Sequence, residues 1–242
     1  MTTTITPELK QYVAQVRHYY SNELCMNDAA HDLEHVDKVC VRILNMRLEL
    51  FPENEELDKL CVLAAYTHDL KCHINRDKHH ELSALYVTNN KDIDPFLKDL
   101  DDVEICDLAD AIRSHRASVD AIRSHRTAVD NTKRTPLSIL LYNADKDEPY
   151  LNIIMRRAIA YRKNNKAGSS NIMGNIMVDV ITHLKDKFSR NGYLKYDEYY
   201  RKYYGDDTID ELYDNIDNLD IEYYMLQNTY LDKPCNHELG IH

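Results

Sequence analysis

The sequence lacks the features that would place it in a membrane or in an export pathway. It has no long apolar run, and its mean hydropathy is -0.58, so we expect no transmembrane helix. The start, MTTTITPELKQ, lacks the basic region followed by an apolar region that is typical of a signal peptide. These absences predict a cytoplasmic protein that does not associate with membranes.

Glycine and paired cysteines are also scarce. All five glycines lie at or after Gly168, so the first two-thirds of the chain contain no glycine-rich phosphate loop of the Walker or dinucleotide type. The six cysteines show no CxxC spacing, which excludes a zinc knuckle and a thioredoxin-like motif. In a chain without an export signal we expect reduced, mostly buried thiols. No motif for a nucleophilic serine or cysteine is present either.

Positive charge is outnumbered, because 30 lysines and arginines face 41 aspartates and glutamates, for a net charge of -11. Nucleic-acid binders usually present a basic surface that neutralises phosphates, so this balance argues against nucleic acid as a partner. It does not argue against a small anionic substrate in a local pocket. A bound metal ion can supply the positive charge that such a pocket needs.

The apolar residues that are present follow a helical period. They repeat at spacings of three and four between Val36 and Leu50 and again between Leu57 and Ala64. Similar spacing occurs in residues 102–128, 136–144, 149–163, 172–188 and 208–226. No segment alternates for long with β-branched residues, so the sequence predicts an all-α fold. With 242 residues, the chain is long enough for one substantial core.

Two stretches interrupt this regular pattern. DAIRSHRASV, from Asp110, is followed by DAIRSHRTAV, from Asp120, and this repeat is too short for a solenoid, so a local duplication is indicated. Residues 189–230 are rich in Tyr, Asp and Asn. We therefore expect a helical core in residues 1–190 and a C-terminal helical, Tyr/Asp-rich appendage in residues 191–242 that packs on it. A partner-binding surface is the alternative for this appendage.

Histidines and aspartates gather at positions typical of metal ligands. AHDLEHVDKV places His31 and His35 at i and i+4, on one face of a predicted helix. His68 and Asp69 end the predicted buried helix from Leu57 to Thr67, and adjacent side chains can reach one ion only near a helix end. Asp145 stands near the end of another apolar helix. Two or three imidazoles and two carboxylates suit a mixed nitrogen and oxygen site for a divalent ion.

The order of these residues resembles the H…HD…D signature of the HD-domain phosphohydrolase superfamily. The matching residues are His35 in EHVDKV, His68 and Asp69 in AAYTHDL, and Asp145 in YNADKD. The flanking segments HHELSA, IRSHRAS or IRSHRTA, NADKDEPYLNIIMRRAIAYR and DVITHLKDKFSRNGY resemble one subgroup of this superfamily. The resemblance covers about residues 28–193.

The resemblance implies an HD-domain helical bundle that holds a divalent metal through His35, His68, Asp69 and Asp145. The expected ion is Mn, Mg, Co, Ni or Fe, and zinc is compatible with the site although no thiolate is suitably placed. It further implies hydrolysis of a phosphate ester or anhydride by a metal-activated water. Asp69, as a ligand, and Glu81, as a general acid or base, are the catalytic candidates.

The remaining site candidates follow from the same comparison. His80 occupies the family's HExxSA position, and a later histidine there, His115 or His125, joins it in some members to hold a second metal. Spacing to Asp145 slightly favours His125, whereas the continuous helix before it favours His115. Arg116 and Arg126 are candidate phosphate clamps, and a solvated helix end explains them equally well.

Two assignments concern the neighbours of these residues. His31 is a candidate for substrate contact or for orienting His35, with a surface histidine as the alternative. His73 and His79 are interpreted as loop residues.

We expect a hydrolase acting on a small phosphorylated metabolite, with a nucleotide as the favoured class. Two alternatives stay open: a di-iron oxygenase of the HD type, and a non-catalytic metal-binding module that uses the C-terminal tract for partners. A homo-oligomer is compatible with the sequence.

Overall fold

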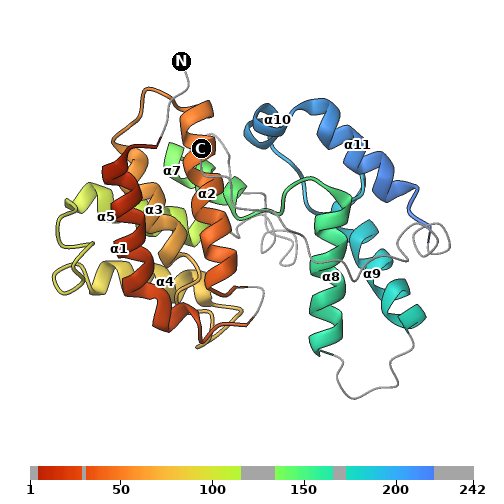
Figure 1. Ribbon diagram of the computed structural model, residues 1–242, viewed down its shortest axis with the longest axis horizontal. Coiled ribbons are helices and arrows are strands. Elements are labelled where there is room, and N and C mark those ends of the chain that lie inside the picture. Colours follow the sequence, from red (N-terminus) through yellow and green to blue (C-terminus); the bar gives the residue numbers. More distant parts are fainter. Residues whose placement is uncertain (1–4, 29–30, 116–133, 166–172, 221–242) are drawn as a thin grey trace. The chain divides into compact units, whose positions relative to one another are not determined.

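The computed structural model describes residues 5–28, 31–115, 134–165 and 173–220. These residues form ten α-helices and no strand, which confirms the all-α expectation (Figure 1). The helices, labelled as in Figure 1, are α1 (Pro7–Leu24), α2 (Leu33–Leu50), α3 (Leu57–Thr67), α4 (His79–Asn89), α5 (Asp102–Ser114), α7 (Pro136–Ala144), α8 (Leu151–Asn165), α9 (Met173–Phe188), α10 (Glu198–Tyr204) and α11 (Asp206–Asp217). Their contacts divide the chain into two compact units.

The first unit contains Ile5–Asp147 and Tyr196–Gly205, and α3 is its central helix. α3 packs against α1, α2, α4, α5 and α7. Its sequence LDKLCVLAAYT is apolar on nearly every side, and the whole stretch from Leu60 to Thr67 is buried. A helix that is apolar all round is stable only inside a core. The C-terminal end of α3, with His68 and Asp69, is therefore enclosed by the surrounding helices.

Local capping residues set where these helices begin. The side chains of Thr6, Asp32 and Thr135 each accept a hydrogen bond from a backbone N–H in the first turn of the helix that follows. Pro7 and Pro136 open α1 and α7, where proline costs no backbone hydrogen bond. Such short polar side chains and first-turn prolines are the usual start signals of a helix.

The start of α2 corrects one expectation about the histidines. The side chain of Asp32 accepts a hydrogen bond of 3.0 Å from the backbone N–H of His35, so Asp32 caps a helix that begins at Leu33. His31 lies before the cap. The predicted pairing of His31 and His35 on one helical face is thus wrong, although the two ring centroids are still only 6.1 Å apart.

The second unit has α8, α9 and α11 as its described helices. α9 and α11 pack together, and Arg190, just after α9, contacts Asp214 at 2.7 Å and Asp210 at 3.6 Å. α11 ends at Asp217, well before the predicted end at residue 226. The carboxylates of its last turn offer no favourable interaction with the negative end of the helix dipole.

α10 belongs to the first unit although it follows α8 and α9 in the chain. It packs on α2 and α7, and its Tyr200 is fully buried, with ring centroids 4.6 Å from both Tyr196 and Tyr204. The break in packing therefore falls after Asp147, whereas the sequence suggested a division at residue 190. Burial of α10's aromatic face against α2 and α7 decides this assignment.

Two further expectations can be compared with the structure. None of the helices in the described part of the chain combines the length and apolar character that a membrane span requires. Among the five described cysteines, Cys40, Cys61 and Cys72 are buried, whereas Cys25 and Cys106 are exposed. Burial raises the pKa of the Cys40 thiol to about 12, so this thiol stays protonated and unreactive at neutral pH.

Candidate metal centre

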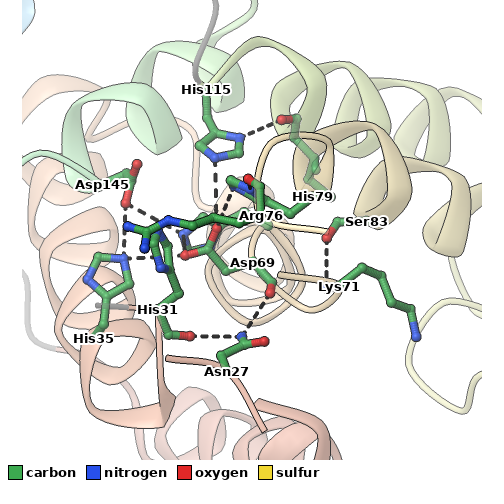
Figure 2. Close-up of polar contacts among 12 residues, drawn as sticks. Asn27, His31, His35, Asp69, Lys71, Arg76, His79, Ser83, His115 and Asp145 are labelled. Carbon is green, nitrogen blue, oxygen red and sulfur yellow. Dashed lines mark hydrogen bonds and ion pairs between the residues drawn. The ribbon is translucent and has the colours of Figure 1, made fainter. Parts of the chain in front are cut away.

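Four side chains from three helices converge at the C-terminal end of α3. His35 comes from the first turn of α2, His68 and Asp69 directly follow α3, and Asp145 directly follows α7. One ligand atom of each lies within 4.8 Å of one ligand atom of every other (Figure 2). The Nε2 atom of His35 is 3.1 Å from Asp145 Oδ1 and 3.6 Å from Asp69 Oδ2. The tertiary fold thus unites the four residues that the sequence selected as metal ligands.

The four side chains differ in their exposure to solvent. The side chains of His35, His68 and Asp69 are 7%, 0% and 2% exposed, whereas that of Asp145 is 28% exposed. Asp145 is therefore the most accessible of the four candidate ligands. Deep burial of the other three ligands keeps bulk water from competing for their donor atoms.

Backbone carbonyls orient three histidines in the same way. The Nδ1 atoms of His68, His79 and His115 lie 2.8, 2.6 and 2.5 Å from the carbonyl oxygens three residues earlier, those of Ala65, Arg76 and Ile112. A carbonyl oxygen can only accept, so each Nδ1 carries a proton and donates it. Each Nε2 is then left as the nitrogen that faces the cluster, which is the arrangement found around metal-bound histidines.

A second group of candidate ligands shares Asp69 with the first. Asp69, His79 and His115 also place one ligand atom each within 4.8 Å of the others, and all three residues are buried. Oδ1 of Asp69 is 2.9 Å from His79 Nε2 and 4.0 Å from His115 Nε2, whereas Oδ2 points to His68 and His35. The two oxygens of one carboxylate therefore serve two adjoining sets of imidazoles.

The structure assigns His79 a different place from the one predicted. It was interpreted as a loop residue, but it is the first residue of α4, 1% exposed, and faces Asp69. His80, the predicted site residue, is only partly buried, and its ring centroid lies 6.3 Å from that of His115. Consecutive helical residues point about 100° apart, so only one of the two can face inward. His79, Ser83 and Val87 are spaced by four residues and form one buried stripe on α4. This spacing is the sequence signal that could have identified His79 as an inward-facing residue.

His115 is the later histidine that the structure brings to the centre. It is 4% exposed, follows α5, and its ring centroid is 5.2 Å from that of His68. The buried stripe of Ile105, Leu108 and Ile112 continues to His115 at helical spacing. The alternative His125 and the candidate phosphate clamps Arg116 and Arg126 lie outside the described residues.

Attraction between the histidines and the carboxylates stabilises the cluster even without a bound metal ion. Burial alone would lower the pKa of His68, but the charges of Asp69 and Asp145 outweigh burial and hold that pKa well above its usual range. Burial would likewise raise the pKa of both carboxyl groups. Contacts of Asp69 with His68 and His79, and of Asp145 with His35 and His68, instead hold both carboxyl pKa values well below their usual range. His115 differs, because burial and the nearby charge of His68 lower its pKa to about 3.

These side chains fit a divalent cation. Nε2 of His68 and Oδ2 of Asp69 are buried, and within the described part of the chain neither has a hydrogen-bond partner, although the two atoms are 3.3 Å apart. Buried polar atoms without such partners are costly unless something else binds them. An ion held by nitrogen and carboxylate oxygen atoms would satisfy both. This set of donor atoms suits several transition metals and Mg and does not select one of them.

Surrounding polar contacts hold the ends of α3 and α7 in place. Nε of buried Arg42 donates to the Ala144 carbonyl at 2.7 Å, and the amide of Asn27 donates to the Asp69 carbonyl at 2.9 Å. On the other side of Asp145, the Tyr200 hydroxyl donates to the Asp147 carbonyl at 2.5 Å. The backbone on both sides of the Asp145 carboxylate is therefore fixed by buried side chains from α2 and α10.

Lys146, next to Asp145, is enclosed by aromatic rings. Its Nζ lies 3.8 Å from the ring centroid of Tyr142 and 5.3 Å from that of Tyr200, and it donates to the Asn143 side-chain oxygen at 2.9 Å. Burial lowers the pKa of Lys146 to about 7. The cation–π contacts anchor the turn that carries Asp145 to α10.

Besides His80, two more predicted site residues lie outside the ligand groups. His31 borders the centre, with its ring centroid 5.7 Å from that of His79, and its Nδ1 contacts Asp28 at 2.8 Å. Glu81, the candidate general acid or base, lies in the first turn of α4 and is exposed, and it joins neither described ligand group.

Comparison with known proteins adds no further assignment. No family model matches the chain, and no curated protein or solved structure is significantly similar to it.

Proposed function

We propose that this protein is a metal-dependent phosphohydrolase of the HD type that acts on a small phosphorylated metabolite, with nucleotides as the favoured class. The observation that carries the proposal is the convergence of His35, His68, Asp69 and Asp145 within 4.8 Å, in the order that the sequence resemblance implies. When bound, a divalent ion lowers the pKa of water and neutralises negative charge on a phosphoryl oxygen.

The chain's own residues supply the rest of the chemistry. His35, His68, Asp69 and Asp145 would hold the ion, and the carbonyl of Ala65 fixes the His68 ring so that Nε2 faces it. His35, His68 and Asp69 are shielded from bulk water, whereas the Asp145 side chain is 28% exposed and is the ligand that a substrate could reach most easily. Bare carboxylates in the cluster would repel a phosphate, so the proposal requires positive charge at the centre, as an ion provides.

The test combines metal analysis with an activity panel. The metal content of the purified protein is measured, and phosphate release from a nucleotide panel is followed with added Mn, Mg, Co or Ni. We expect about one ion per chain from the single four-residue group, and turnover of one nucleotide class. A metal-loaded protein that releases no phosphate from any member of the panel would refute the phosphohydrolase assignment while leaving the metal centre in place.

Ligand variants connect the two measurements. Asp69→Ala is expected to abolish both metal binding and phosphate release while far-UV circular dichroism stays helical. This substitution also leaves buried histidines without their carboxylate, at a cost of about 3–5 kcal/mol, so a second variant is needed. Asp145→Ala removes a partly exposed ligand and disturbs the core less. Full activity in either folded variant would contradict the ligand assignment.

A two-metal centre is the second candidate, favoured by the adjoining group of Asp69, His79 and His115. Two irons per chain without phosphate release would support the di-iron oxygenase alternative. The non-catalytic binding module predicts instead a metal-loaded, inert protein that captures a partner through residues 195–230.

A further inference from the structure

A row of ionisable side chains borders the metal centre without belonging to either ligand group. Nη1 of Arg76 lies 2.9 Å from Asp28 Oδ2, and Asp28 Oδ1 lies 2.8 Å from His31 Nδ1. The Arg76 and Asp28 side chains are 45% and 43% exposed, in contrast to the buried ligands. Figure 2 shows Arg76 extending from the loop before α4 across the view of the cluster, toward His31. This row, called the rim below, joins the solvent to the centre.

The position of Arg76 is tied to the centre through its backbone. Its carbonyl oxygen accepts the Nδ1 proton of His79 at 2.6 Å, and His79 in turn faces Asp69. At the other end of the rim, the His31 ring lies 5.7 Å from His79 and 6.1 Å from His35, centroid to centroid. A ligand that contacts the rim would therefore also lie next to the candidate metal ligands.

We propose that Arg76, assisted by His31, forms the subsite that binds a phosphoryl group of the substrate, and that Asp28 is an internal counter-ion which this group displaces. The proposal rests on the proposed function, because it assigns the anion-binding part of the same site. The guanidinium group offers a planar fork of donors that matches the oxygens of a phosphate. It already pairs with the carboxylate of Asp28, so the side chain can hold an anionic group at the edge of the centre.

The rim explains how an acidic chain could attract an anion. With a net charge of -11, the protein repels phosphates at long range, and such repulsion is screened beyond about 10 Å at ordinary ionic strength. Local donors must then capture the ligand. Arg76 is such a donor among the described residues. Asp28 lowers its affinity for an anion by competing for the same guanidinium atoms.

Opposite effects of two substitutions test this idea. Inorganic phosphate is titrated calorimetrically into the protein loaded with the ion that metal analysis identifies. Arg76→Gln is expected to weaken phosphate binding about tenfold, the lower end for loss of a charge-assisted hydrogen bond at a partly exposed site. Asp28→Asn is expected to tighten binding about threefold or more, because the guanidinium loses its competitor. The double variant should bind phosphate more weakly than the wild type, because Arg76 is the main donor that Asp28 occupies and His31 only assists it.

A matched control separates local recognition from general charge. Arg113 is also 45% exposed and pairs with a carboxylate, that of Asp110, at 2.7 Å, so Arg113→Gln removes the same charge from a comparable ion pair. It is expected to change phosphate affinity by less than about twofold.

The outcomes distinguish this inference from the function on which it rests. Phosphate binding that is equal in the wild type and Arg76→Gln would overturn the role of Arg76 and leave the phosphohydrolase proposal intact. If Asp28→Asn lost as much binding as Arg76→Gln, the ion pair would have a structural role only. That result would also overturn the proposed role of Arg76. If the metal-loaded wild type binds no phosphate, the proposed function itself fails.

Discussion

The proton on His68 gives a quantitative prediction about metal binding. Nδ1 of His68 donates to the Ala65 carbonyl, so the proton that titrates is on Nε2, the same atom that would bind the ion. That nitrogen lies 3.3 Å from Asp69 Oδ2 and 3.6 Å from Asp145 Oδ1. Against the effect of burial, these carboxylates raise the pKa of His68 well above its usual value of about 6.5. In the metal-free protein the neighbouring carboxylates therefore favour the protonated form of His68.

An ion must displace this proton, which makes its affinity depend on pH. Below the raised pKa of His68, each unit of pH decrease should weaken metal binding about tenfold, or about 1.4 kcal/mol. Between pH 6.5 and pH 5.5, an interval that lies below the raised pKa, the dissociation constant should thus rise about tenfold. Titration calorimetry in buffers of different ionisation enthalpy should detect about one proton released per ion. An affinity that is constant over this interval, with no proton release, would refute the reasoning.

The same shifts predict how the stability of the metal-free protein varies with pH. The raised pKa of His68 adds stability that is complete below about pH 6.5 and is lost as the pH rises through the folded pKa. The lowered carboxyl pKa values of Asp69 and Asp145 add stability that is complete above about pH 4 and is lost on acidification. His115 acts in the opposite sense to His68, because its lowered pKa removes stability as the pH falls below about 6.5. Urea unfolding with chelator present should therefore show stability that falls on acidification from about pH 6.5. His68→Gln, which cannot titrate, should lose the decline above about pH 6.5.

Three substitutions test the scaffold around the centre, each by urea unfolding of the metal-free protein. Leu63→Ala, in the central helix and 0% exposed, should lower the free energy of unfolding by about 2–5 kcal/mol, and a loss below 1 kcal/mol would mean that α3 is not in the core. Tyr200→Phe removes the hydrogen bond to the Asp147 carbonyl and should cost about 0.5–1.5 kcal/mol; an unchanged midpoint would show that this bond is not formed. Gly205 ends α10 at φ 90° and ψ 141°, so Gly205→Ala should cost about 1–3 kcal/mol, and a stabilised variant would contradict the described backbone.

Much of the fold followed from short-range patterns in the sequence. The predicted helices over Leu57–Thr67 and residues 136–144 coincide with α3 and α7, because both are continuous apolar runs with clear ends. Proline at the first position and a Thr cap fixed the start of α7. For the same reason His68, Asp69 and Asp145 were correctly placed at helix ends. The interpretation of these residues as metal ligands stays a prediction.

The tertiary structure decided which neighbours face that site. His79 and His80 are adjacent residues of the same type, and the packing of α4 against α5 and α3 determines that His79 faces inward. Asp28 and Arg76 are 48 positions apart by number, so no local pattern could pair them. The chain alone thus determines helices and their ends, which depend on residues within a few positions of one another. Convergence of side chains from α2, α3, α4, α5 and α7 depends on long-range packing, and only the folded chain supplies it.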